Sequence, residues 1–119
     1  MPGDRKPTAA QLLEHEFAQE KASALGRLGR ALEREIARLA SFDAAHPREG
    51  LRVEHGRARA SLVAQASQAL WEFIVQREAC GLRDMRYVLR DYRVPREVAD
   101  RMGIASAPLN ARGRGRGTR

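Results

Sequence analysis

The sequence predicts an all-α protein: a long antiparallel helical hairpin followed by two short helices and a disordered basic C-terminal tail. Apolar residues recur at three- and four-residue steps over two long stretches, which is typical of amphipathic helices. Helix-capping residues, glycines and prolines separate these stretches from two shorter ones. The composition agrees with a globular domain, since 43% of the 119 residues are hydrophobic and 31% are charged.

The first helix is predicted to begin after Thr8 and to end near Phe42. Thr8 and Gln11 form a capping-box pattern, in which a hydroxyl and an amide satisfy free backbone N–H groups at a helix start. An apolar stripe follows at helical spacing, made up of Leu13, Phe17, Leu25, Leu28, Leu32, Ile36 and Leu39. A helix of this length spans about 50 Å, more than a compact domain of this size, so it needs partners along its length.

Residues 43–56 contain Pro47, Gly50 and Gly56 and few apolar side chains, so we expect a long connection there. A second helix is predicted over residues 57–80, with Gly81 as its left-handed C-terminal cap. Asp84 is expected to cap a third helix. Pro95 favours the first turn of a fourth helix, Arg96–Met102, which Gly103 ends.

The net charge of +7 is concentrated at the C-terminal end. Residues 104–119 hold four arginines and no acidic residue, and glycine–arginine alternation cannot bury apolar surface. We therefore expect a flexible segment over residues 1–7, one helical domain over residues 8–103 and a disordered tail over residues 104–119.

Parts of the sequence resemble a family of small bacterial proteins known as a domain of unknown function. The resemblance is carried by residues 18–30, 69–84, 88–98 and 101–103, and most distinctively by the Gln-Arg-Glu-Ala-Cys-Gly-Leu-Arg-Asp segment of residues 76–84. It covers roughly residues 12–103, and it implies an all-helical fold without an activity.

Two features of the predicted hairpin suggest how its helices pack and what remains uncovered. In an antiparallel pair, the numbers of facing residues add to about 100, which places Gly26 and Gly29 opposite the segment from Trp71 to Ile74. We expect Trp71 to fill that notch, although the glycines are also tolerable as surface positions. The stripe Leu32, Ile36 and Leu39 faces the weak start of the second helix, so it is predicted to be the surface for a homodimer or a protein partner.

Catalytic, metal and cofactor sites are not predicted. Glu20 and Arg77 are expected to form a buried polar pair, with a role in helix register favoured over acid–base chemistry. Cys80, the only cysteine, cannot form a disulfide within the chain, and it lies at a helix end that disfavours a thiolate. The three histidines form no metal motif, and no cofactor or hydrolase signature is present. Without an apolar run of about 20 residues or a signal-peptide pattern, a cytoplasmic location is expected.

The alternative to a protein-interaction module is a nucleic-acid accessory protein. Arg112, Arg114 and Arg116 in the tail are candidate contacts to nucleic acid. Residues 88–102 also resemble part of a helix-turn-helix. Against this alternative, Arg93 stands where glycine is usual in the turn, and Glu97 carries the wrong charge for phosphate.

Overall fold

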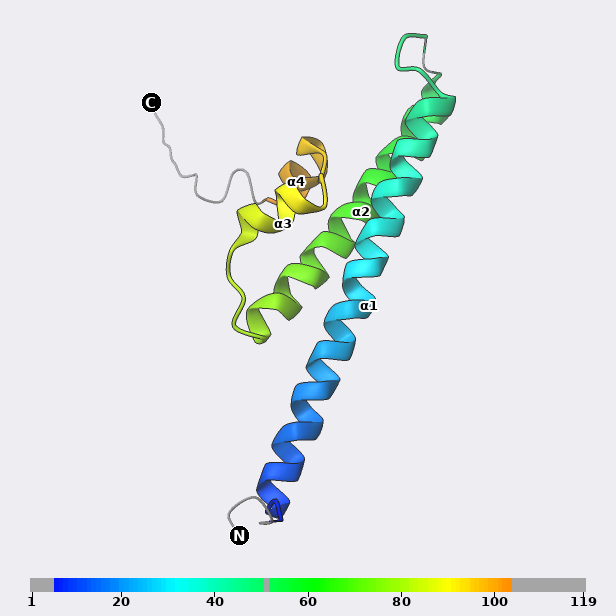
Figure 1. Cartoon of the computed structure of the whole chain (residues 1–119). Helices are drawn as coiled ribbons and strands as arrows, with labels where there is room; N and C mark the ends of the chain where they lie inside the picture. The colour runs from blue at the N-terminus through cyan, green and yellow to red at the C-terminus, as the bar shows by residue number, and fades with distance from the viewer. Residues whose placement is uncertain (1–5, 51, 104–119) are drawn as a thin grey trace, which may run out of the picture.

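The computed structural model of the chain describes residues 6–50 and 52–103. This part contains four helices and no strand, which confirms the predicted all-α class: α1 (Ala9–Ala45), α2 (Val53–Ala79), α3 (Met85–Asp91) and α4 (Arg96–Met102). Figure 1 shows α1 and α2 side by side, with the two short helices on the flank of α2. The predicted basic tail lies outside the described residues.

α1 begins where its capping box predicts. The Thr8 N–H donates to Gln11 Oε1 at 2.8 Å, and the Gln11 N–H donates to Thr8 Oγ1 at 3.1 Å. The helix continues to Ala45, three residues beyond the expected end, and His46 closes it with an N–H donated to the Phe42 carbonyl. With 37 residues, α1 is about 55 Å long.

The connection between the long helices is shorter than expected, because α2 starts at Val53 instead of residue 57. Glu54 lies in the first turn, where a carboxylate is favourable near the positive end of the helix dipole, and it pairs with Arg52 at 3.2 Å. A Cβ at Gly56 would have open space around it, so no packing contact requires a glycine there. Its effect on α2 is the lower helix propensity of glycine. The helix therefore continues through Gly56, where the sequence had predicted a loop.

Polar contacts between α1 and α2 show that the two helices run in opposite directions. Near one end of the pair, Arg38 Nη1 donates to Gln65 Oε1 at 3.1 Å. Near the other end, Gln76 Nε2 donates to the Lys21 carbonyl at 3.4 Å. Residue numbers therefore rise along one helix as they fall along the other.

The end of α2 and the two short helices follow the predicted caps. Gly81 takes a left-handed φ of +83°, and the next residue, Leu82, donates its N–H to the Arg77 carbonyl at 2.8 Å. The Asp84 carboxylate caps α3 by accepting from the Tyr87 N–H. Pro95 is the residue just before α4, and Gly103 ends that helix with a φ of +92°.

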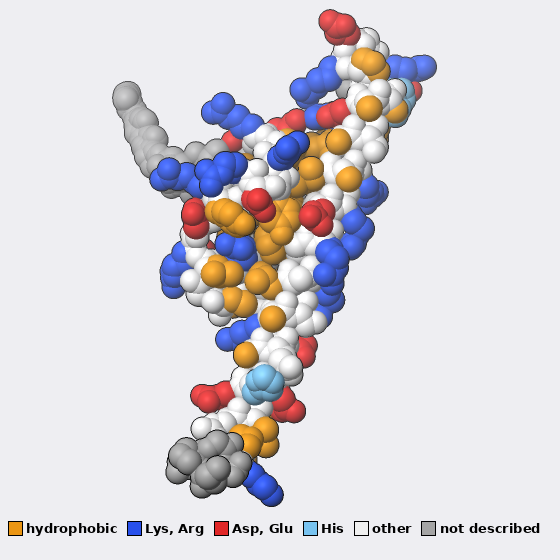
Figure 2. Space-filling view, in the orientation of Figure 1, with side chains coloured by type: hydrophobic (Ala, Val, Ile, Leu, Met, Phe, Trp, Pro, Cys, Tyr) orange, Lys and Arg blue, Asp and Glu red, His pale blue; other side chains and the backbone are white. Residues whose placement is uncertain are grey.

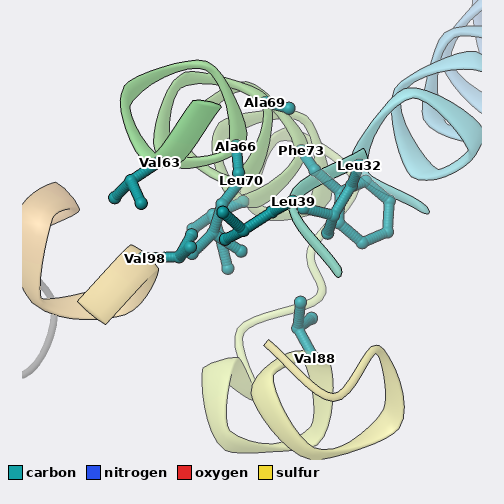
Figure 3. Packing of buried hydrophobic residues seen from close by; sticks show 10 residues of the cluster. Leu32, Leu39, Val63, Ala66, Ala69, Leu70, Phe73, Val88 and Val98 are labelled. Carbon is teal, nitrogen blue, oxygen red and sulfur yellow. The ribbon is translucent and has the colours of Figure 1, made fainter. Parts of the chain in front are cut away.

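The core lies where α1, α2, α3 and α4 meet, around the C-terminal half of α1 (Figure 3). Its fully buried side chains come from all four helices and are almost all aliphatic: Leu32, Leu39, Leu70, Val88 and Val98. Ser67 is buried among them because its hydroxyl donates to the Val98 carbonyl at 2.8 Å, which fixes α4 against α2. Half of the first helix therefore lies outside the core.

Candidate interaction surface

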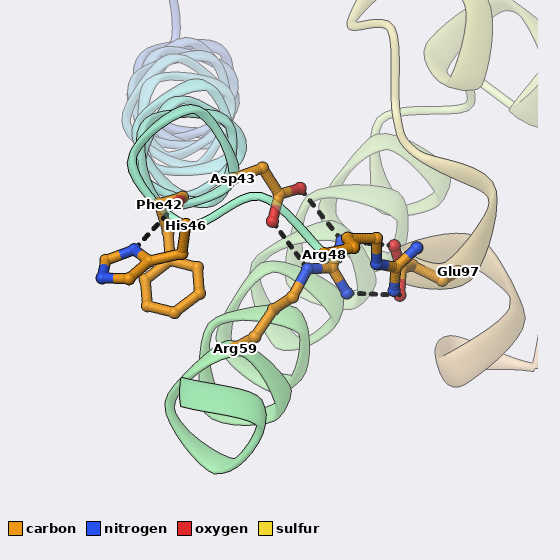
Figure 4. Close-up of polar contacts among 6 residues, drawn as sticks. All are labelled: Phe42, Asp43, His46, Arg48, Arg59 and Glu97. Atoms are coloured by element: carbon orange, nitrogen blue, oxygen red, sulfur yellow. Dashed lines mark hydrogen bonds and ion pairs between the residues drawn. The ribbon is translucent and has the colours of Figure 1, made fainter. Parts of the chain in front are cut away.

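A buried arginine joins three helices at the end of α1 (Figure 4). The guanidinium of Arg59 donates to both carboxylate oxygens of Asp43, at 2.6 and 3.0 Å, and to both of Glu97, at 2.6 and 2.8 Å. Arg48 adds a longer contact of 3.8 Å to Glu97. Two bidentate pairs satisfy most of the donors of Arg59, so this charge is tolerated although its side chain is only 9% exposed.

The ion pairs of Arg59 shift the acid–base behaviour of all three side chains. The hydrogen bonds from Arg59 hold the pKa of Asp43 and that of Glu97 below their usual values, against the opposing effect of desolvation. In return, the hydrogen bonds to Glu97 and Asp43 raise the pKa of Arg59. All three groups are charged at neutral pH, and they form a structural junction rather than an acid–base pair.

This junction was not among the sequence predictions, although a signal for it exists. Arg59 lies on the same helical stripe as Val63, Ala66 and Leu70, which face the core. A charged residue on an apolar stripe requires a partner of opposite charge. Asp43 is close to the end of the preceding helix, but nothing in the local sequence identifies Glu97, which only the tertiary fold brings to Arg59.

Of the two glycines predicted to form a notch, only Gly29 lies against another helix. A Cβ at Gly29 would come within 3.3 Å of the Phe73 ring and 3.0 Å of the Tyr92 hydroxyl oxygen, whereas a Cβ at Gly26 would meet only the Arg30 side chain. The prediction that Trp71 occupies the notch is wrong, because Trp71 is half exposed and Phe73 takes that place. The two residues are about 200° apart on α2, so only one of them can face α1.

Aromatic side chains around Gly29 form a small cluster. The Phe73 and Tyr92 rings pack edge to face with centroids 5.2 Å apart, and the guanidinium of Arg77 lies 5.7 Å from the Phe73 ring. Burial raises the pKa of the Tyr92 hydroxyl. The absence of a side chain at Gly29 is what lets these rings approach α1.

Arg77 and Glu20 do not occupy the buried positions predicted for them. Glu20 is exposed on α1, while the guanidinium of Arg77 lies over the rings of Phe73 and Tyr87. The buried ionic contact of the described residues is made by Arg59 instead. α2 carries both arginines, and the one nearer the start of the helix is the one enclosed by carboxylates.

The predicted interaction stripe is buried within the chain. Leu32 and Leu39 are 0% and 2% exposed, and Ile36 packs against the same core. α2 covers them, since Arg38 is level with Gln65, well inside that helix, and α4 packs onto α2 through Ser67. These three residues are therefore core residues, and the apolar surface left uncovered lies elsewhere on α1.

That surface is in the N-terminal half of α1, whose first turns extend beyond the end of α2. Leu12, Leu13 and Phe17 are exposed by 51%, 50% and 58%. α1 is 37 residues long and α2 is 27, so about 15 Å of α1 has no helix beside it. In Figure 2, small hydrophobic patches lie on this lower part of α1, separated by a histidine and by acidic side chains.

A groove of about 560 Å³ lies where this half of α1 meets the end of α2. Phe17, Ala18, Ala22 and Leu25 form its wall on α1, and Ala79 and Cys80 close it from the end of α2. Its charged residues are Glu14 and Lys21, two turns apart on α1. We call this face, formed by residues 14, 17, 18, 21, 22 and 25 of α1 with Ala79 and Cys80, the overhang surface.

Histidines and the cysteine are distributed over separate parts of the structure. Cys80 is a free, partly exposed thiol. His46 and His55 lie with ring centroids 4.5 Å apart, and His46 stacks on Phe42, while His15 is on the exposed half of α1. Within residues 6–50 and 52–103, no three His, Cys, Asp or Glu side chains are grouped as metal ligands.

The part predicted to resemble a helix-turn-helix has the expected pair of helices. Arg93, in the turn, adopts a left-handed φ of 51°. Val98 is fully buried against α2, and Glu97 beside it is held by Arg59. Arg112, Arg114 and Arg116, the candidate nucleic-acid contacts, lie outside the described residues.

The fold and the overhang surface together define a small all-helical protein with one long helix partly free of intramolecular partners. The chain belongs to a family of unknown function, DUF6665, whose model matches residues 4–110. No curated protein and no solved structure matches it. In the described part of the chain, none of the helices has the length and apolar character needed to cross a membrane.

Proposed function

We propose that this protein is a helical protein-interaction module, an antiparallel hairpin of α1 and α2 whose overhang surface receives a helix from a partner. The observation that carries the proposal is the 58% exposure of Phe17, a large apolar side chain, in a groove that the end of α2 borders. Large exposed apolar groups beside a groove are characteristic of helix-in-groove recognition. The proposal gives the protein no catalytic role and no cofactor.

The groove supports a helical partner in particular. It is shallow and elongated along α1, and its lining alternates large side chains with alanines, as helix–helix packing requires. The neighbouring stretch of α1 already packs against α2 in this way. A partner helix at the overhang surface would continue the same two-helix packing toward the start of α1.

Site-specific photo-crosslinking in the native cell tests this function. A photoreactive amino acid at Ala18, in the groove, is expected to give a discrete crosslinked adduct. The same amino acid at Leu12, which lies about 150° around the helix from the groove, is the matched control and is expected to give little. Equal adducts at both positions, or none at Ala18, would contradict the proposal.

The nucleic-acid alternative has one observation in its favour, the exposed arginines Arg96 and Arg101 on α4. Salt-dependent binding to DNA or RNA that requires these arginines or the arginine-rich tail would support it. The acidic Glu97 and Asp100 share the pocket that contains Arg101, which makes this face electrostatically mixed. We therefore place this function second.

A further inference from the structure

Resting on the function proposed above, we infer that the partner of the overhang surface is a second copy of this chain, docked antiparallel about a two-fold axis near Phe17 and Ala18. A two-fold axis makes the same patch serve both copies, so the patch must be complementary to itself. The overhang surface meets this condition in charge and in size.

The charges favour the antiparallel arrangement. With the axis between residues 17 and 18, the helical rise alone brings Glu14 of one copy level with Lys21 of the other, and this pair occurs twice. Both residues line the groove, so both point toward the interface. A parallel pairing in register would instead place Glu14 against Glu14 and Lys21 against Lys21, which is repulsive at both levels.

The sizes of the side chains agree with the same axis. The two Phe17 rings meet beside the small Ala18 residues at the centre, where a buried aromatic anchor contributes most to binding. Further out, the large Leu25 of one copy lies level with Ala10 of the other. Small residues opposite large ones allow the helices to approach closely.

The end of α2 leaves room for the second helix if the two α1 helices cross at the common angle of about 50°. The first turn of the partner's α1 lies about 11 Å from the axis, so this angle displaces it sideways by about 8 Å. That distance is close to the spacing of two packed helices. Ala79 and Cys80, which form the far wall of the groove, are level with Ala18, so the partner helix passes beside them close to the axis.

Sedimentation equilibrium of the purified full-length chain tests the second copy as partner. The wild type is expected to dimerise, and Phe17→Glu to weaken the dimer more than about 100-fold by placing two carboxylates at the axis. Leu12→Glu, with the same added charge on the opposite face, is expected to leave it within about twofold. Phe17 is largely exposed, so circular dichroism is expected to show the same helix content for both variants.

Charge reversal tests the register. Glu14→Lys and Lys21→Glu each turn two attractive contacts into two repulsive ones, and each is expected to raise the dissociation constant about tenfold. The double variant, which exchanges the two charges, is expected to restore wild-type affinity. Single variants that dimerise normally, or a double variant that does not recover, would overturn this register.

The outcomes separate the two proposals. A wild-type chain that stays monomeric at all accessible concentrations overturns the second copy as partner. If Ala18 then still crosslinks to a different protein in the cell, the interaction function stands without self-association. If neither dimer nor crosslink is found, both proposals fail.

Discussion

The two halves of α1 have similar sequence patterns and opposite environments. Both carry leucine and phenylalanine or isoleucine at helical spacing among charged residues. In the C-terminal half, Leu32 and Leu39 are buried under α2 and the short helices, whereas in the N-terminal half Leu13 and Phe17 are half exposed or more. An amphipathic pattern shows that a helix face will be covered, but it does not show by which element.

What differs between the halves is the partner that the rest of the chain supplies. α2 ends at Ala79, about level with Ala18 of α1, and the chain then turns back toward α4. α3 and α4 therefore pack on the core, beside the part of α1 that α2 already covers. Among the described residues, the neighbours of the remaining part of α1 come from the end of α2.

The strongest test of this difference is the loss of a core side chain. Leu32→Ala is expected to lower the free energy of unfolding by about 2–5 kcal/mol, because it leaves a cavity among four helices. Urea unfolding followed by circular dichroism measures it. A loss below about 1 kcal/mol would mean that this half is not the core.

Removing the arginine junction is expected to have the next largest effect. Arg59→Ala frees two carboxylates that are partly exposed, at 37% and 41%, so we expect a loss of about 2 kcal/mol, less than for fully buried partners. Arg48→Ala removes only the longer contact to Glu97 and serves as the control. Equal losses for the two variants would contradict the importance of the bidentate pairs.

The same junction predicts a dependence on pH. The folded-state pKa values of Asp43 and Glu97 lie below their ordinary values of 3.8 and 4.5, so the unfolded state binds more protons in that range. Their stabilising contribution is complete above about pH 5 and is lost as the pH falls through the folded-state values. Unfolding measured from pH 6 to pH 3 is expected to show a steeper loss for the wild type than for Arg59→Ala; parallel curves would exclude this linkage.

Gly29 and Gly26, three residues apart on α1, occupy a packed position and an open one. Gly29→Leu is expected to lower stability by about 1–3 kcal/mol, because its side chain would overlap the Phe73 ring and the Tyr92 hydroxyl. Gly26→Leu meets only the mobile Arg30 side chain and is expected to be neutral or slightly stabilising. Thermal melts of both variants measure the difference, and the reverse order would place the helix contact at Gly26.

The smallest effect is expected in the uncovered half of α1. At concentrations low enough to keep the chain monomeric, Phe17→Ala is expected to change the free energy of unfolding by less than about 0.5 kcal/mol. Urea unfolding at several protein concentrations measures it. A large effect that persists on dilution would show that Phe17 packs within its own chain.

Features fixed by local chemistry could be predicted from the sequence. Thr8, Asp84 and the glycines at residues 81 and 103 mark helix ends through hydrogen bonds or backbone angles within a few residues. Features that depend on tertiary packing could not. Whether Phe73 or Trp71 faces α1 depends on the rotation of α2 about its own axis. The ion pair between Arg59 and Glu97 depends on how α4 packs against α2.

The start of α2 shows the same limit. Gly56 and Pro47 predicted a long connection, yet the helix starts at Val53 and continues through Gly56, and Arg59 on it contacts Asp43 at the end of α1. Leu39 is level with residues near Gln65, inside the second helix as the sequence already predicted it, so it is buried between the two long helices. The uncovered surface therefore lies at the opposite end of α1 from the predicted stripe at residues 32–39.

The position of Gly81 determines how far α1 extends beyond the end of α2. Its left-handed conformation stops α2 at a fixed point, and the distance from that point to Thr8 sets how much of α1 stands alone. A relative with this glycine one helical turn later along the chain would have a shorter free segment, and one with it a turn earlier a longer segment. A change in the spacing between Thr8 and Gly81 would therefore change the length of this free segment of α1 without altering the core.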